Sequence, residues 1–140
     1  MPHTVVNCYV HCVFGTKAGV LEMDPDFQKR LWAYMGGIAK KRGIGPIAIG
    51  GAGNHVHLLL SMPATLSIAE AMYLIKGGSS RWANDEFAEY SGFAWQSGYG
   101  AFSVDSSRVA HVIAYINNQW EHHRVISFDD EMSDLARAAV

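Results

Sequence analysis

Two histidines separated by one apolar residue are the first feature of this 140-residue sequence that could do chemistry. His55 and His57 begin an apolar run that ends in three leucines. In a strand, the two-residue period would place both imidazoles on one face, about 7 Å apart along the strand, and Val56 and Leu58 on the other. Two neutral imidazoles that converge in this way can bind one cation. A surface or hydrogen-bonded pair is the alternative, and the spacing leaves both interpretations open.

Two other histidine chemistries can be tested on the same segment. Nucleotide hydrolases of the histidine-triad type need a third alternating histidine, and Leu59 stands at that place. Two-histidine phosphoesterases need two separate motifs in which a serine or threonine follows two places after the histidine, and no such motif is evident. The sequence therefore excludes both classes.

A second candidate segment is residues 109–120, where apolar side chains recur at helical spacing. His111, Tyr115 and Gln119 repeat every four residues and would form a polar ridge beside the apolar stripe. A hydroxyl and a carboxamide one turn apart could share one site. The ring of Tyr115 could equally pack at the boundary of the core, as amphipathic aromatic side chains do. The segment alone does not decide between these two interpretations.

The elements that must position these residues follow a definite order. Strands are expected at 5–14, 44–49, 55–62 and 95–104, and helices at 24–42, 67–75, 106–123 and 127–139. Ser67 with Glu70 forms a capping-box pattern, and Gly50–Asn54 predicts a hairpin turn between the second and third strands. Lys76–Ser80 is expected to end or interrupt the second helix.

This order, β-α-β-β-α-β, predicts an α+β fold of the split β-α-β, or ferredoxin-like, type. Its core would be a four-stranded antiparallel sheet, followed by an added C-terminal helix that contains Tyr115. The length favours one domain over residues 1–140, and hydrophobic residues at 49% suffice for one core.

Composition also limits location and partners. No apolar run reaches the roughly 18 residues of a membrane helix, and no signal peptide is evident at the start, so a cytoplasmic protein without membrane contact is expected. The formal net charge of −2 argues against broad, nonspecific binding to duplex DNA. A nucleic-acid site would have to use local basic groups, a metal ion and specific contacts.

Four segments, taken in order, resemble the single-tyrosine transposases of the HUH class, in which two histidines flank one apolar residue. The similarity is to the insertion-sequence two-hundred type and its repeat-associated relatives, and it covers nearly the whole chain. The segments resemble the family's metal-binding strand, second-helix segment, fourth strand and catalytic helix; they are Gly53–Leu59, Lys76–Trp82, Trp95–Val104 and Tyr115–Arg124.

The resemblance implies roles for individual residues. His55, His57 and Gln119 would bind a divalent metal, Mg²⁺ or Mn²⁺, and Tyr115 would be the nucleophile. The enzyme would cleave and rejoin single-stranded DNA next to hairpins through a 5′-phosphotyrosine intermediate. It would act as a homodimer, in which each catalytic helix can serve the histidines of the partner. Imidazole also suits Zn²⁺ and Ni²⁺, so the identity of the metal stays open.

Lys76 and Arg81 lie beside small residues that could let the backbone approach a hairpin phosphate, and we expect them to contact DNA. Two other functions remain open at this point. A domesticated relative with the same fold could bind single-stranded nucleic acid without transposing it. The chain could also be a structural dimer with a vestigial metal site.

Overall fold

The computed structural model describes residues 3–119 and 127–138. The strands form one antiparallel sheet with the order β2-β3-β1-β4, which confirms the predicted α+β, split β-α-β arrangement. The elements are β1 (Tyr9–Gly15), α1 (Pro25–Lys41), β2 (Gly45–Ala52), β3 (His55–Ser61), α2 (Ile68–Glu86), the 3-10 turn η1 (Ala88–Tyr90), β4 (Gly100–Val104), the 3-10 turn η2 (Ser106–Arg108), α3 (Val109–Asn117) and α5 (Phe128–Ala138).

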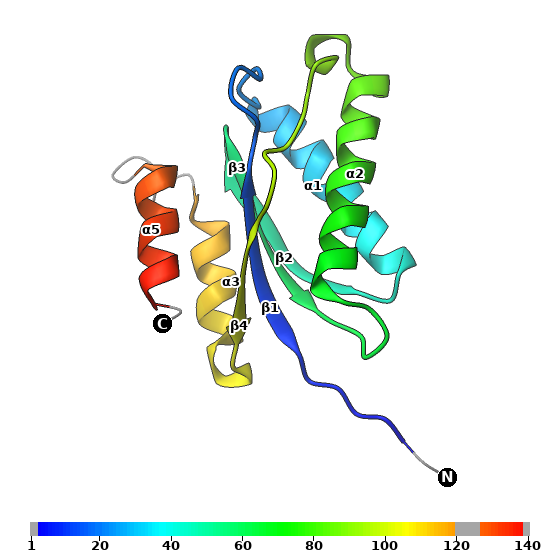
Figure 1. Ribbon diagram of the computed structural model, residues 1–140, viewed down its shortest axis with the longest axis vertical. Helices are drawn as coiled ribbons and strands as arrows, with labels where there is room; N and C mark the ends of the chain where they lie inside the picture. Colours follow the sequence, from blue (N-terminus) through cyan, green and yellow to red (C-terminus); the bar gives the residue numbers. More distant parts are fainter. Residues whose placement is uncertain (1–2, 120–126, 139–140) are drawn as a thin grey trace.

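Both faces of the sheet are covered, and the two covers differ. α1 and α2 lie against one face, whereas α3 and α5 lie on the opposite side (Figure 1). The main core fills the first face, where alternate residues of the central strands, such as Cys12, Val56 and Leu58, are buried under the two long helices. A smaller cluster on the second face joins Leu59 of β3 and Ala48 of β2 to Ile116 of α3.

The β2–β3 hairpin is confirmed, but its turn is shorter than expected. Gly50 and Gly51 were predicted to lie in the turn, yet they pair with His57 and Val56, so β2 continues to Ala52. Glycine keeps both backbone hydrogen-bonding groups, so a glycine-rich segment can extend the ladder as readily as it can turn. The turn itself is residues 53–54.

The interruption predicted at Lys76–Ser80 is wrong, because α2 runs unbroken from Ile68 to Glu86. Ser79 is buried within this stretch, and its hydroxyl donates to the carbonyl of Ile75 at 2.6 Å. Two glycines weaken a helix by about 1 kcal/mol each, but packing of the buried helical face outweighs local propensity.

The outer limits of other elements also differ from the predictions. β1 begins at Tyr9, because Val5 and Val6 are exposed and lie before the paired residues. β4 begins only at Gly100, and earlier in that predicted strand Trp95 makes one isolated bridge to Thr16. Strand pairing depends on a partner's register, which local composition does not reveal.

The helix predicted at 106–123 is shorter and starts differently. Its first turn is the 3-10 element η2, where the carboxylate of Asp105 accepts from the backbone N–H of Ser107 at 3.0 Å. α3 then ends at Asn117, and residues 120–123 of the prediction lie outside the described residues. The last predicted helix is confirmed as α5, with its position 139 outside the described residues.

Across residues 3–119 and 127–138, no helix has both the length and the apolar character needed to cross a membrane.

The predicted capping box at the start of α2 is present and provides a test of the fold. The backbone N–H of Glu70 donates to the Ser67 hydroxyl at 3.1 Å, and the N–H of Ser67 donates to the Glu70 carboxylate at 3.4 Å. We expect Ser67→Ala to lower the free energy of unfolding by about 1 kcal/mol, because it removes the cap. Urea denaturation measures the loss. The exposed Thr65→Ala is the control, and equal effects of the two variants would contradict the capping role.

Candidate active site

β3 carries the two histidines on the face opposite the main core. His55 pairs with Gly15 of β1, and His57 pairs with Val13, so both imidazoles lie over the central strands of the sheet. Both are fully buried, and their ring centroids are 5.1 Å apart. The predicted shared face is therefore correct, and the pair is not a surface feature in the described part of the chain.

α3 brings Tyr115 to these histidines through a close approach to β2. A side-chain carbon at Gly50 would lie 2.7 Å from the backbone oxygen of Ile116, so only glycine allows this contact without displacement of the helix. The ring of Tyr115 then stands edge-on to His57, with 5.6 Å between centroids. The ring packs beside the smaller cluster while its hydroxyl points into the site, so both interpretations of Tyr115 hold at once.

Gln119 reaches the same point from beyond the end of α3. The sequence placed it on one helix with Tyr115, but Asn118 leaves the helical conformation and its N–H bonds to Ala114 and Tyr115 carbonyls. Gln119 is nevertheless fully buried, and its Oε1 lies 2.9 Å from Nε2 of His55. The helix end, rather than helical spacing, therefore directs this carboxamide into the site.

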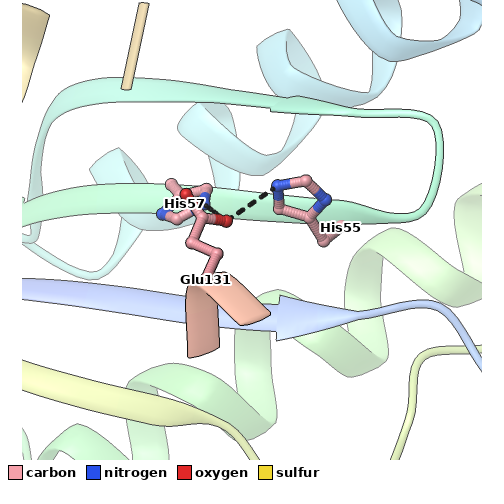
Figure 2. A group of neighbouring side chains, drawn as sticks. All are labelled: His55, His57 and Glu131. Atoms are coloured by element: carbon pink, nitrogen blue, oxygen red, sulfur yellow. Dashed lines mark hydrogen bonds and ion pairs between the residues drawn. The ribbon is translucent and has the colours of Figure 1, made fainter. Parts of the chain in front are cut away.

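The sequence did not predict a fifth group, the carboxylate of Glu131 on α5. Figure 2 shows it pointing between the two imidazoles. Its Oε1 is 3.1 Å from Nε2 of His57 and 3.4 Å from Nε2 of His55. Its Oε2 accepts from the hydroxyl of Tyr115 and, at 3.0 Å, from the amide of Gln119. One buried carboxylate thus contacts all four predicted site residues.

α5 is seated over the site by apolar contacts as well. The ring of Phe128 stacks on His55 with 4.3 Å between centroids. A side-chain carbon at Gly15 would lie 2.8 Å from the Phe128 ring, so the glycine opposite His55 makes room for it. Further along the helix, Met132 lies against Gly100 of β4. Two positions of α5, Phe128 and Met132, therefore fix where Glu131 enters.

Burial and hydrogen bonds shift the pKa values of these groups. Burial lowers the pKa of His11 to about 4, and His57 adds to this shift, so His11 is neutral near pH 7. Burial raises the pKa of Tyr115 well above its usual value, and the hydrogen bond to Glu131 raises it further. Burial alone would raise the pKa of Glu131, but hydrogen bonds with His57, Tyr115 and Gln119 outweigh it and lower this pKa well below its usual range.

The hydrogen-bond directions bring electron-rich atoms together. Nε2 of Gln119 donates to Glu131 at 3.0 Å and to the carbonyl of Tyr115 at 3.4 Å, which turns its Oε1 toward His55. Both ring nitrogens of His55 face an amide oxygen at 2.9 Å, Nδ1 that of Asn54 and Nε2 that of Gln119. When neutral His55 carries its proton on Nδ1 and donates it to Asn54, its lone pair is on Nε2. That lone pair faces the oxygens of Gln119 and Glu131. A positive charge among these atoms would remove their repulsion.

The donor set fits a divalent cation. Ligand atoms of His55, His57 and Glu131 all lie within 4.8 Å of one another, and adjacent contacts measure 2.9, 3.1 and 3.4 Å. Neighbouring ligands about 2.1 Å from an octahedral ion are themselves about 3 Å apart. Imidazole nitrogens combined with carboxylate and amide oxygens suit Mn²⁺, Zn²⁺ or Mg²⁺.

The two predicted DNA-binding residues lie away from this cluster, on α2. Lys76 and Arg81 both line a groove of about 510 Å³ that also includes the exposed Tyr73. The ammonium of Lys76 donates to the carbonyls of Gln96 at 2.8 Å and Gly98 at 2.6 Å, so it holds the segment before β4. Arg81 is exposed.

Comparison with protein families decides what this arrangement belongs to. A family described as "Transposase IS200 like" matches residues 4–119, a span that contains both histidines, Tyr115 and Gln119. The chain belongs to the IS200-like transposases. Glu131 lies beyond residues 4–119, the span that the family matches.

Two solved structures share the fold. A candidate transposase from Deinococcus radiodurans R1 has a TM-score of 0.65 and 23% identity, with 85% of this chain and 96% of that chain covered. A REP-associated tyrosine transposase bound to a REP hairpin also has a TM-score of 0.65, with 12% identity and coverage of 100% and 86%. A comparison with curated proteins finds no match.

Sequence reasoning missed two groups of this IS200-like transposase, His11 and Glu131. His11 had a weak signal: in the predicted first strand it alternates with Val10 and Cys12, so it falls on the face of the histidine pair. Glu131 had no such signal in the sequence. Acidic residues in the first turn of a helix are common at exposed positions, so its residue type did not point to a buried site.

The contacts of Gln119 generate a test. We expect Gln119→Ala to reduce metal-dependent DNA cleavage at least about tenfold, the loss seen even when an outer partner of a metal ligand is removed. Hairpin affinity should stay nearly unchanged, because the carboxamide is buried among the other site groups. Cleavage assays and fluorescence anisotropy measure the two quantities. The neighbouring, exposed Asn118→Ala is the control, and equal losses of cleavage and binding in Gln119→Ala would contradict a ligand role.

Proposed function

We propose that this IS200-like transposase cleaves and rejoins single-stranded DNA beside hairpins, with Tyr115 as nucleophile and with a divalent metal. One observation carries the proposal. A tyrosine hydroxyl, a carboxamide and two imidazoles meet around a single buried carboxylate, although the five groups come from β3, α3, the segment after α3 and α5. A packing role would require none of these polar groups to converge.

His55, His57, Gln119 and Glu131 would hold the metal, as Mg²⁺ or Mn²⁺. When bound, the ion would act as a Lewis acid and template for an anionic phosphodiester. Gln119 is uncharged, so Glu131 would be the one protein ligand of these four oxygen and nitrogen donors whose negative charge partly neutralises the cation. The cation would keep the rest of its positive charge for the phosphate. The carboxylate was not among the ligands that the family resemblance implied, and it would add a fourth protein ligand.

Tyr115 would attack the phosphorus atom as its hydroxyl proton passes to solvent. The bond from phosphorus to the 3′ oxygen breaks, the departing oxygen takes up a proton, and a 5′-phosphotyrosine and a free 3′-hydroxyl result. Glu131 accepts the hydrogen bond of the phenol, but its lowered pKa makes it a weak base. A nearby cation favours the phenolate, and this supports metal dependence. Another 3′-hydroxyl can reverse the step and join a new strand.

The DNA would meet the protein at two places. Single-stranded DNA must reach His55 and His57, which are fully buried under α5, so this helix has to move when the strand binds. The groove beside Arg81 would contact a hairpin backbone, with the exposed ring of Tyr73 available for stacking. Lys76 would contribute to DNA binding through its positive charge and by fixing the segment before β4 with its hydrogen bonds to Gln96 and Gly98. The hairpin in the complex of the REP-associated relative supports this kind of DNA partner.

Covalent capture tests the nucleophile. We expect hairpin-flanked single-stranded DNA and Mn²⁺ to give a covalent adduct that Tyr115→Phe abolishes, because phenylalanine lacks the attacking oxygen. Denaturing gel electrophoresis and mass spectrometry of the labelled peptide identify the adduct.

Tyr34→Phe is the matched control, since it removes a hydroxyl from a ring stacked on Trp82 away from the site. Hairpin binding by the wild-type chain with no adduct would instead support the binding-only, domesticated alternative.

A mixing experiment tests which subunit supplies the tyrosine. We propose that the chain forms a homodimer, and within one chain Tyr115 already lies beside His57. We therefore expect a mixture of Tyr115→Phe and His57→Ala subunits to remain inactive, because each chain has an incomplete site. Adduct formation in the mixture, absent from either variant alone, would mean that the helices are exchanged between subunits.

A further inference from the structure

His11 stands behind the histidine pair and contacts neither Glu131 nor Gln119 by a hydrogen bond in the described part of the chain. It lies on β1, the strand paired on both sides, by β3 and by β4. Its side chain is 5% exposed, and its Nε2 is 2.8 Å from Nδ1 of His57. This buried imidazole is neither one of the proposed metal ligands nor the nucleophile.

The hydrogen bond between His11 and His57 can run in two directions, with different consequences. If His57 donates from Nδ1, neutral His57 has its lone pair on Nε2, 3.1 Å from Oε1 of Glu131, and a cation could join these two atoms in place of the proton of a hydrogen bond. If His11 donates, His57 must carry its proton on Nε2, and that nitrogen cannot bind a cation. The partner at Nδ1 therefore determines whether His57 is a ligand.

We propose that His11 is a positioning residue that accepts the Nδ1 proton of His57 and so keeps Nε2 of His57 available to a divalent cation. This inference rests on the proposed metal site. His11 would play for His57 the part that Asn54 can play for His55, whose Nδ1 lies 2.9 Å from the Asn54 oxygen. Both histidines then present Nε2, and only Nε2, to the same point.

Packing holds His11 in the orientation that this role needs. Its ring stands edge-on to Tyr115 at 6.0 Å between centroids and lies 6.3 Å from the ring of Phe102 on β4. The ring of His57 lies at 5.0 Å with an interplanar angle of 27°, so the two imidazoles are nearly parallel. His11 therefore supports both the candidate ligand and the ring of the candidate nucleophile.

Metal affinity without DNA tests the role. We expect His11→Phe to weaken Mn²⁺ binding about 10- to 100-fold, because the ring is kept but the acceptor is lost. His11→Gln should restore affinity, since its terminal oxygen can accept at the former Nε2 position. Electron paramagnetic resonance of free Mn²⁺ measures binding in the full chain. His111→Phe, which removes an exposed imidazole from α3, is the control and should bind like the wild type.

Long-range ¹H–¹⁵N correlation spectra give a second readout that does not depend on any variant folding. With Zn²⁺ as a diamagnetic probe, wild-type His57 should carry its proton on Nδ1 and show a metal-shifted Nε2. A proton on Nε2, or a metal-shifted Nδ1, would overturn the inference, as would unchanged Mn²⁺ affinity in His11→Phe. His57→Ala distinguishes failure of the proposed metal site from failure of the His11 role alone. If His57→Ala also binds Mn²⁺ normally, the metal site itself is wrong.

Discussion

The pairing of β1 with β3 is the constraint on which the site depends. Its register sets His57 opposite Val13 and His55 opposite Gly15. A slip of one residue would exchange the two faces, burying imidazoles among the leucines and aromatic rings of the main core. The alternation of side chains along β3 that places leucines in this core therefore places the two histidines on the opposite face.

Buried polar atoms on that second face need partners, and the structure supplies them from distant parts of the chain. α3 approaches closely because Gly50 has no side chain, and α5 adds a carboxylate that reaches both histidines, the tyrosine and the carboxamide. Such a network is stable only when every member is satisfied. The ligand atoms of the two histidines and of Glu131 also converge on one point, which is the geometry that the proposed cation would need.

The family match and the geometry of the site do not extend over the same residues. The family match ends at residue 119, whereas Glu131 lies on the following helix. The matched span contains the tyrosine, the carboxamide and the histidine pair. The carboxylate and the helix that carries it over the site lie outside that span.

The sequence alone determined the fold class and the shared face of His55 and His57, because the alternation of side chains along a strand is a local property. That Tyr115 meets these histidines was implied only by the family resemblance. Sequence reasoning misjudged the glycine segments at 50–51 and 77–78, because glycine permits a turn, a strand or a helix and only neighbouring elements select one. Tertiary structure alone decided that α3 ends before Gln119, that His11 stands behind His57 and that Glu131 enters the site. These contacts join residues from 12 to 76 positions apart, and no local pattern encodes their meeting.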